Sequence, residues 1–210
     1  MQPKTSTEEP FVTFIIPTIG RETLSNSFKC LIDQTDPNWK AIVIFDGMSL
    51  TIESPDHRIK LITCEKLGDG HNGGGSVRNY GMQFVDTEWI AFLDDDDSIS
   101  REYVSTLKKE ITNYNDIDFI LFRMEYWGHI LPHINASNVS QGCCGISFAI
   151  RSKIFKGGHK FKNSSSEDFK FLCSSCEFGY KFMLSSHILY FARKYKDIEN
   201  KALGTRLYIN

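Results

Sequence analysis

Four consecutive carboxylates, Asp94–Asp97, come directly after the apolar run Ile90–Leu93. They lie within about 13 Å of extended chain, so their charges repel one another. Burying them is costly unless a cation joins them. Hard divalent ions such as Mn²⁺ and Mg²⁺ prefer carboxylate oxygens. The stretch therefore predicts one of two things: a solvated acidic turn that also caps the following helix, or a divalent-metal site.

The elements that precede and follow these acids alternate in type. Dense apolar and β-branched residues predict strands at 11–16, 40–45, 59–64 and 90–93. Apolar residues at helical spacing predict helices at 24–32, 76–84 and 101–113. The alternation predicts an α/β chain with a parallel, doubly wound sheet and right-handed crossovers.

Ligands of such sheets bind outside the carboxyl ends of the strands, where the strand order reverses. Three polar loops are expected there: Thr18–Arg21, Asp46-Gly47 and Asp94–Asp97. Asp46 is either a turn former or a ligand-binding carboxylate. We expect these loops to share one edge of the sheet.

The second half of the chain carries fewer clear signals. Strands are predicted at 118–127, 145–151, 181–184 and 187–193. The run Ser164–Asp168 predicts the start of a helix, with serines as caps and Glu167 and Asp168 at its positive end. Ser76 is a candidate cap for the helix that it begins.

Composition limits the class of protein. The 210 residues are 41% apolar and 24% charged, which fits one globular domain behind a flexible leader, residues 1–10. The net charge of −2 gives no broad attraction to nucleic acid. No apolar run approaches the roughly 18 residues of a membrane span. We expect a soluble, cytoplasmic protein; its oligomeric state stays open.

Cys173 and Cys176 form a CxxC sequence. Such a pair binds metal or acts in redox chemistry in many proteins. The two residues also fall at helical spacing with neighbouring apolar residues, which is typical of buried thiols on a helix face. Both interpretations stay open.

Six short motifs follow one another along the chain: Phe14–Thr18, Ile44–Gly47, Arg78–Gly81, Phe92–Asp97, Gly157-Gly158 and Glu167-Asp168. The set resembles one family, the family 2 glycosyltransferases of the GT-A fold. Each motif is weak alone, but their order and spacing are specific. The resemblance runs from about Phe11 to about Arg193. It implies a Rossmann-like single domain, residues 11–210, whose central, mostly parallel sheet is flanked by helices, with a smaller mixed sheet on the acceptor side.

The resemblance also implies site roles. In it, residues 11–115 form the nucleotide-sugar-binding half and residues 116–210 the acceptor-binding half. Asp96 matches the ligand of Mn²⁺ or Mg²⁺, with Asp94 as a further ligand or a neighbour of the ion. Asp168 matches the general base of inverting members. The donor-binding positions are Pro17, Thr18, Ile19, Arg21, Asp46, Arg78, Asn79, Asp94 and Asp95, and the acceptor-side positions are Trp127, Gly157, Gly158 and Glu167.

The implied function is inverting, metal-dependent transfer of a sugar from a UDP-sugar, with UDP-glucose or a related hexose favoured, to an acceptor hydroxyl of a glycan or glycoprotein. A divalent ion stabilises the charge that develops on a diphosphate leaving group. One departure from the family is Phe45, which stands where many members carry the first of two acids. 

Two other functions stay open. One is a sugar-phosphate nucleotidyltransferase, which would usually carry a glycine-rich basic loop after its first strand; Thr18–Arg21 has one glycine. The other is a non-catalytic module that binds nucleotide sugars.

Overall fold

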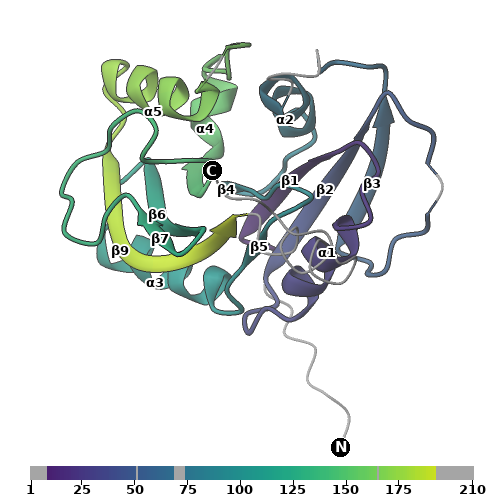
Figure 1. Cartoon of the computed structure of the whole chain (residues 1–210), viewed down its shortest axis with the longest axis horizontal. Helices are drawn as coiled ribbons and strands as arrows, with labels where there is room; N and C mark the ends of the chain where they lie inside the picture. The colour runs from purple at the N-terminus through teal and green to yellow at the C-terminus, as the bar shows by residue number, and fades with distance from the viewer. Residues whose placement is uncertain (1–8, 51, 69–73, 165, 193–210) are drawn as a thin grey trace, which may run out of the picture.

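The computed structural model describes residues 9–50, 52–68, 74–164 and 166–192 (Figure 1). Most of the predicted leader lies outside the described residues, and so does Arg193. Among the described helices, none is long and apolar enough to cross a membrane.

The first half of the chain forms the predicted parallel strands. β1 (Val12–Thr18) pairs with β2 (Trp39–Asp46) on one side and with β4 (Trp89–Phe92) on the other. β3 (Ile59–Cys64) extends the sheet beyond β2. All these pairings are parallel, so the carboxyl ends of the four strands share one edge.

The second half adds strands to the same sheet. β8 (Phe148–Arg151) lies antiparallel between β4 and β6 (Phe119–Tyr126), and β9 (Phe182–Ala192) runs parallel to β6. The described residues form one nine-stranded sheet in the order β3-β2-β1-β4-β8-β6-β9-β5, with β7 on β6. The mixed acceptor-side sheet is therefore one portion of a continuous sheet.

Three strands differ from the sequence predictions. The two late strands are one, β9, whose register against β6 shifts on either side of Arg123. The shifts accommodate extra residues of β9 without ending the ladder. β5 (Ser98–Ile99) and β7 (His129–Leu131) were not predicted, because two or three residues carry no readable alternation.

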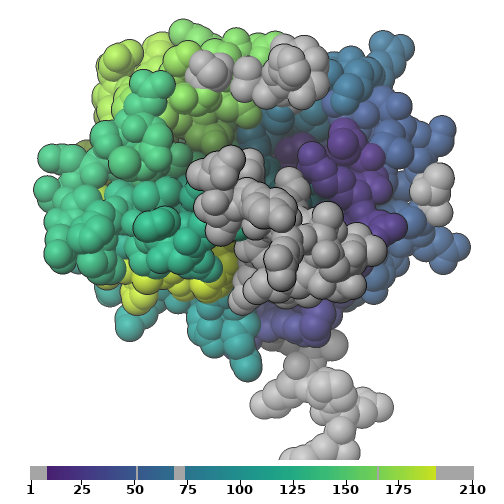
Figure 2. Space-filling view, viewed as in Figure 1, coloured from purple at the N-terminus to yellow at the C-terminus, as the bar shows by residue number. Residues whose placement is uncertain are grey.

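In the part of the chain that the structure describes, five helices cover the sheet. α2 (Gly74–Met82), α4 (Ser152–Lys156) and α5 (Glu167–Glu177) gather on one side in Figure 1, and α1 (Leu24–Ile32) and α3 (Tyr103–Asn113) on the other. In the space-filling view the early part of the chain, purple to blue, lies on the right and the late part, green to yellow, on the left (Figure 2).

The predicted serine caps are wrong. Ser166 is the N-cap residue of α5, but it has φ 57° and makes no capping bond through its side chain. α2 begins at Gly74, so Ser76 lies inside its first turn. A left-handed non-glycine residue is uncommon and is found most often at functional sites.

An aromatic cluster joins α5 to the centre of the sheet. Phe161 stacks on Phe171 of α5 with ring centroids 4.3 Å apart, and it meets Phe92 of β4 edge-on at 5.3 Å. Phe148 of β8 contacts both Phe92 and Phe171. These rings are buried, and their packing places the start of α5 opposite the carboxyl end of β4.

Candidate active site

The aspartates after β4 are mostly buried: Asp95 is 1% exposed, Asp97 5% and Asp96 9%. The prediction of a solvated turn is therefore wrong. Desolvation was expected to require a bound ion, but the chain itself supplies cations and hydroxyls to these acids from distant positions. Neither sequence interpretation included that arrangement.

Asp95 fixes the loop after β1. Its carboxylate accepts a hydrogen bond from Thr18 Oγ1 at 2.7 Å and pairs with Arg21. Thr18 Oγ1 in turn accepts the N–H of Gly20 at 2.9 Å. Burial raises the pKa of Asp95, and the bonds from Thr18 and Arg21 offset part of that rise. Asp95 therefore holds the loop after β1 in place.

Asp97 is bound by β9. The hydroxyl of Tyr190 donates to Asp97 Oδ2 at 2.8 Å, and its oxygen accepts the backbone N–H of Asp94 at 3.2 Å. Ser27 Oγ of α1 lies 3.3 Å from the carbonyl oxygens of Asp94 and Asp97. Asp97 does not cap α3, which begins at Tyr103. Neither Tyr190 nor Ser27 was predicted as a site residue from the sequence. The one signal for Tyr190 is that a buried tyrosine hydroxyl usually needs a hydrogen-bond partner.

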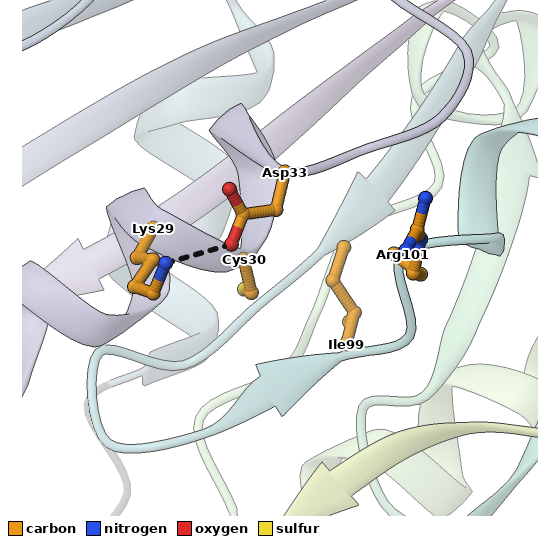
Figure 3. Close-up of a pocket in the computed structure, with 5 residues that line it drawn as sticks. All are labelled: Lys29, Cys30, Asp33, Ile99 and Arg101. Atoms are coloured by element: carbon orange, nitrogen blue, oxygen red, sulfur yellow. Dashed lines mark hydrogen bonds and ion pairs between the residues drawn. The ribbon is translucent and has the colours of Figure 1, made fainter.

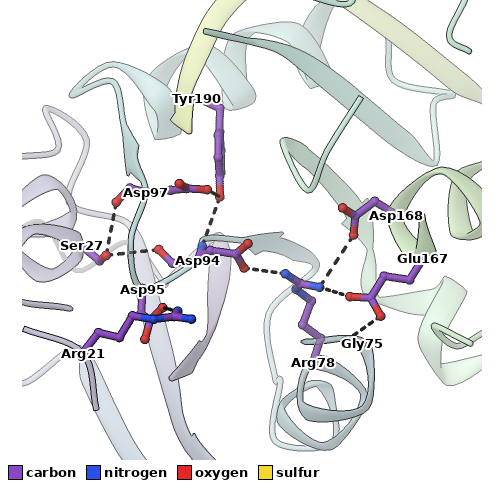
Figure 4. A network of polar contacts seen from close by, with 10 residues as sticks. All are labelled: Arg21, Ser27, Gly75, Arg78, Asp94, Asp95, Asp97, Glu167, Asp168 and Tyr190. Atoms are coloured by element: carbon purple, nitrogen blue, oxygen red, sulfur yellow. Dashed lines mark hydrogen bonds and ion pairs between the residues drawn. The ribbon is translucent and has the colours of Figure 1, made fainter. Parts of the chain in front are cut away.

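One guanidinium joins the two halves of the site. Arg78 Nη2 donates to Asp94 Oδ1 at 2.5 Å, and Nη1 donates to Glu167 Oε1 at 2.7 Å (Figure 4). Asp168 Oδ1 lies 3.7 Å from the same Nη1. Burial opposes the charge of Arg78, but the carboxylates outweigh it and raise its pKa. Arg78 thus stays charged among three acids.

The two acids at the start of α5, Glu167 and Asp168, have raised pKa values. Burial raises the pKa of Asp168 to about 6, although Arg78 pulls it down. Burial also raises the pKa of Glu167 to about 7, against the same influence of Arg78. Asp168 Oδ1 is buried and has no hydrogen bond within the described part of the chain. A carboxylate of this kind has the pKa and the open lone pair that a general base needs.

Asp46 ends β2 as predicted and is 5% exposed. It accepts hydrogen bonds from Lys66 Nζ and from the N–H of Leu67, both at 2.6 Å, and from the N–H of Gly68 at 3.1 Å. Burial works against its charge, yet these donors lower its pKa. Lys66, which the sequence analysis did not single out, is half exposed beside it.

Asn79 has a partner other than the one expected. Its amide donates to Phe161 O at 2.8 Å, and its Oδ1 accepts the N–H of Phe161 at 3.0 Å. Both ends of the amide are therefore used to hold α2 to the loop before α5. This geometry does not support a direct contact between Asn79 and a nucleotide-sugar donor.

The remaining donor-side positions are near the carboxyl end of β1. Pro17 lies within β1, in register with Ile44, and does not end the strand. Ile19 is exposed in the loop that follows. Arg21 is partly exposed, so its guanidinium is accessible from solvent.

Apart from Glu167 at the start of α5, the predicted acceptor-side positions lie in two places. Gly157 ends α4 as its C-cap residue, and Gly158 follows with φ 92°, a conformation that favours glycine. Trp127 is 37% exposed at the tip of the β6–β7 hairpin, where it and Gly128 both have positive φ. The tip follows the carboxyl end of β6 and so lies at the same edge of the sheet as the acids.

A metal site with three or more His, Cys, Asp or Glu ligands is absent from the described residues. Asp94 and Asp96 supply two hard carboxylates from one strand end. That donor set fits Mg²⁺ or Mn²⁺, which are commonly held by one or two carboxylates and complete their shell with phosphate and water oxygens. Cys173 and Cys176 both lie on α5 and belong to no metal cluster in this part of the chain.

A separate pocket of about 490 Å³ opens beside α1 (Figure 3). It is lined by Lys29, Cys30, Asp33, Ile99 and Arg101. Lys29 and Asp33 pair with each other at 2.9 Å. None of the predicted site residues lines this pocket, so we do not assign the chemistry to it.

Comparisons with known proteins identify the family of the chain. The model of the family described as "Glycosyl transferase family 2" matches residues 13–189. A β-1,3-glucosyltransferase of Escherichia coli, named as using UDP-Glc and α-D-GlcNAc-diphosphoundecaprenol, is 33% identical over 96 residues, which are 43% of this chain and 36% of that protein. Glycosyltransferase GlyA of Streptococcus pneumoniae is 31% identical over 111 residues, 49% of this chain and 15% of that protein. These alignments thus span about a third or less of the relatives' length.

Solved structures show the same fold. TarS 1–349 of S. aureus superposes with a TM-score of 0.66 at 17% identity, over 90% of this chain and 62% of that one. Its complex with UDP-GlcNAc gives 0.66 at 16% identity, over 87% of this chain and 58% of that one. The GT-A fold expected from the six motifs is confirmed.

Proposed function

The chain belongs to glycosyl transferase family 2, and we propose that it is an inverting, divalent-metal-dependent enzyme that moves a sugar from a UDP-sugar to an acceptor hydroxyl. The observation that carries the proposal is the shared guanidinium of Arg78. It links Asp94, at the strand end proposed to hold the donor diphosphate, to the start of α5, where Asp168 keeps a buried oxygen without a hydrogen bond.

In the proposed reaction Asp168 takes the proton of the acceptor hydroxyl. The acceptor oxygen forms a bond to the anomeric carbon as the bond from that carbon to the diphosphate oxygen breaks, and UDP leaves with the electron pair. Attack from the face opposite the leaving group inverts the anomeric centre. Proton transfer to a positioned base contributes about 10²- to 10⁴-fold to such rates.

The donor side is assigned to residues from three strand ends. Asp96, with Asp94, would hold Mn²⁺ or Mg²⁺, which when bound offsets the charge of the diphosphate leaving group. Asp46 and Lys66 would face the nucleobase, and Arg21 the phosphates. Asp95, Asn79 and Tyr190 would position these groups rather than touch the donor.

Both substrates are proposed by class. UDP-glucose is favoured as donor because the E. coli relative is named for UDP-Glc. The acceptor expected from the motifs is a glycan or glycoprotein. The relative's name makes a diphosphoundecaprenol-linked GlcNAc a further acceptor to test. Trp127 offers an exposed aromatic ring against which a sugar could stack.

A donor screen tests the proposal. The protein is incubated with Mn²⁺ and UDP-glucose, UDP-galactose or UDP-GlcNAc, and released UDP is measured with and without acceptor. We expect UDP release that requires the metal and that fails in Asp168→Asn. Asp116→Asn is the matched control, because Asp116 is exposed and pairs only with Lys181 among the contacts described for it.

The other functions predict different results. Release of pyrophosphate from a nucleoside triphosphate and a sugar phosphate would indicate a nucleotidyltransferase. Binding of UDP-sugars without any turnover, hydrolysis included, would indicate a binding module. Either result would overturn the proposed function.

A further inference from the structure

Glu167 is directed toward the donor side of the site. Its Oε1 accepts the hydrogen bond from Arg78 Nη1 at 2.7 Å, and its Oε2 accepts the N–H of Gly75 at 3.0 Å (Figure 4). The side chain is 12% exposed. Glu167 was expected on the acceptor side, but both of its oxygens are bound by α2. The carboxylate lies at the positive N-terminal end of a helix other than its own, where a negative charge is favoured.

The backbone of both helices permits this approach. A Cβ on Gly75 would lie 2.4 Å from Glu167 Oε2, and one on Gly74 would lie 2.8 Å from Arg78 Nη1. Side chains at these two positions would push the carboxylate or the guanidinium away. On the opposite side, the left-handed conformation of Ser166 sets the direction in which α5 starts.

Glu167 and Asp168 face the same nitrogen atom. Nη1 of Arg78 is 2.7 Å from Glu167 but 3.7 Å from Asp168 Oδ1, which is too far for a hydrogen bond. Asp168 Oδ1 consequently has no hydrogen bond among the described residues, although it is buried. If Glu167 did not hold Nη1, Arg78 could turn to Asp168 and shorten this 3.7 Å ion pair to a direct hydrogen bond.

We propose that Glu167 is a positioning residue: it binds Arg78 and the first turn of α2, and so keeps Asp168 close to a cation but free to accept a proton. This inference rests on the proposed function, in which Asp168 is the base. A direct bond from Arg78 would stabilise the ionised form of Asp168 and make it a weaker base. Above about pH 7, where Glu167 is ionised, its charge is what competes for Arg78, and the test is made at such a pH.

The test compares Glu167→Gln with Glu167→Asp. UDP-glucose with Mn²⁺ is the probe, with water as the acceptor, and UDP affinity is measured by calorimetry. In Glu167→Gln we expect kcat to fall about 10- to 100-fold while the Kd for UDP changes less than about threefold. Glu167→Asp keeps the charge and should retain more activity than Glu167→Gln. A merely structural bridge predicts the reverse order, because glutamine keeps the length of the side chain.

Several outcomes separate this inference from the proposed function. If Asp168→Asn is inactive while Glu167→Gln turns over within twofold of the wild type, the inference fails and the proposed function stands. If Asp168→Asn is fully active, the proposed base itself is wrong. If Glu167→Gln does not fold, Gly75→Ala displaces the carboxylate without removing it; kcat within twofold of the wild type in that variant would likewise overturn the inference.

Discussion

Tyr190 donates a hydrogen bond to Asp97 across 93 positions of sequence, at 2.8 Å, and both side chains are buried. The contact ties the last described strand to the acidic end of β4. It means that the geometry of the proposed metal and donor site depends on a residue outside the first half of the chain.

Tyr190→Phe removes this hydroxyl and leaves Asp97 short of one buried donor. Losing a partner of a buried charged group costs about 1–3 kcal/mol, so we expect a lower free energy of unfolding in urea. UDP affinity with Mn²⁺ should fall about tenfold, or about 1.4 kcal/mol, because Asp94 also loses its contact with the hydroxyl. Tyr114→Phe is the control, since Tyr114 is exposed. Unchanged stability and affinity would show that the contact is not needed.

Asp96→Asn tests the metal assignment. A ligand that binds only the native state stabilises it, by about 2.7 kcal/mol at 100 times its Kd. For the wild type we expect UDP to raise the Tm only when Mn²⁺ is present. Asp96→Asn should lose the Mn²⁺-dependent part, whereas the exposed Asp33→Asn should keep it. If UDP with Mn²⁺ raised the Tm of Asp96→Asn as much as that of the wild type, Asp96 would not be a metal ligand.

The pKa of Asp168 predicts a pH profile. Only the ionised carboxylate takes a proton, and burial raises its pKa to about 6. The rate of UDP-glucose hydrolysis should therefore rise about tenfold per pH unit below about pH 6 and level off above it. In Asp168→Asn the rate should no longer rise with pH below about pH 6. The rate itself should be about 10²- to 10⁴-fold lower than in the wild type. A profile that is flat from pH 4.5 to pH 7 in the wild type would contradict the role of Asp168.

Glu167 predicts a change of stability with pH. Burial raises its pKa from 4.5 to about 7 in the folded protein, so the folded state binds more protons than the unfolded state between those values. This contribution to stability is complete below about pH 4.5 and is lost as the pH rises through about 7. Glu167→Gln lacks it. Between pH 5 and pH 8, the free energy of unfolding in urea should fall less for Glu167→Gln than for the wild type. Equal falls would refute the raised pKa of Glu167.

The elements that sequence predicts well are those with long local patterns. β1, β2, β4 and α1 each bury a run or a stripe of apolar residues that is readable without the rest of the chain. β3 is a readable apolar run as well, although within it only Ile59 is buried. The order of these elements was sufficient to predict the parallel half of the sheet and the edge at which the polar loops meet. The short strand β5 has no such pattern, because its pairing with β9 is set by residues far away in sequence.

The contacts inside the site were not predictable for the same reason. The motifs named Arg78 and Glu167 separately, but they did not show that these residues, 89 positions apart in sequence, bind each other. The partners of Asp95 and Asp97 depend equally on strand order and register. A run of four aspartates indicates that charge must be offset, but it does not show which distant side chains offset it.

The long sequence separation of Asp97 and Tyr190 also has a consequence for folding during synthesis. On the ribosome, Asp97 emerges 93 residues before Tyr190. At about 5–20 residues per second, that interval lasts roughly 5–19 s. Throughout it, the nascent chain carries the acidic strand end without its buried hydroxyl donor. For most of it Arg78 also lacks its partner Glu167, which emerges before Tyr190. Translation must therefore reach β9 before the acidic strand end acquires its native contacts.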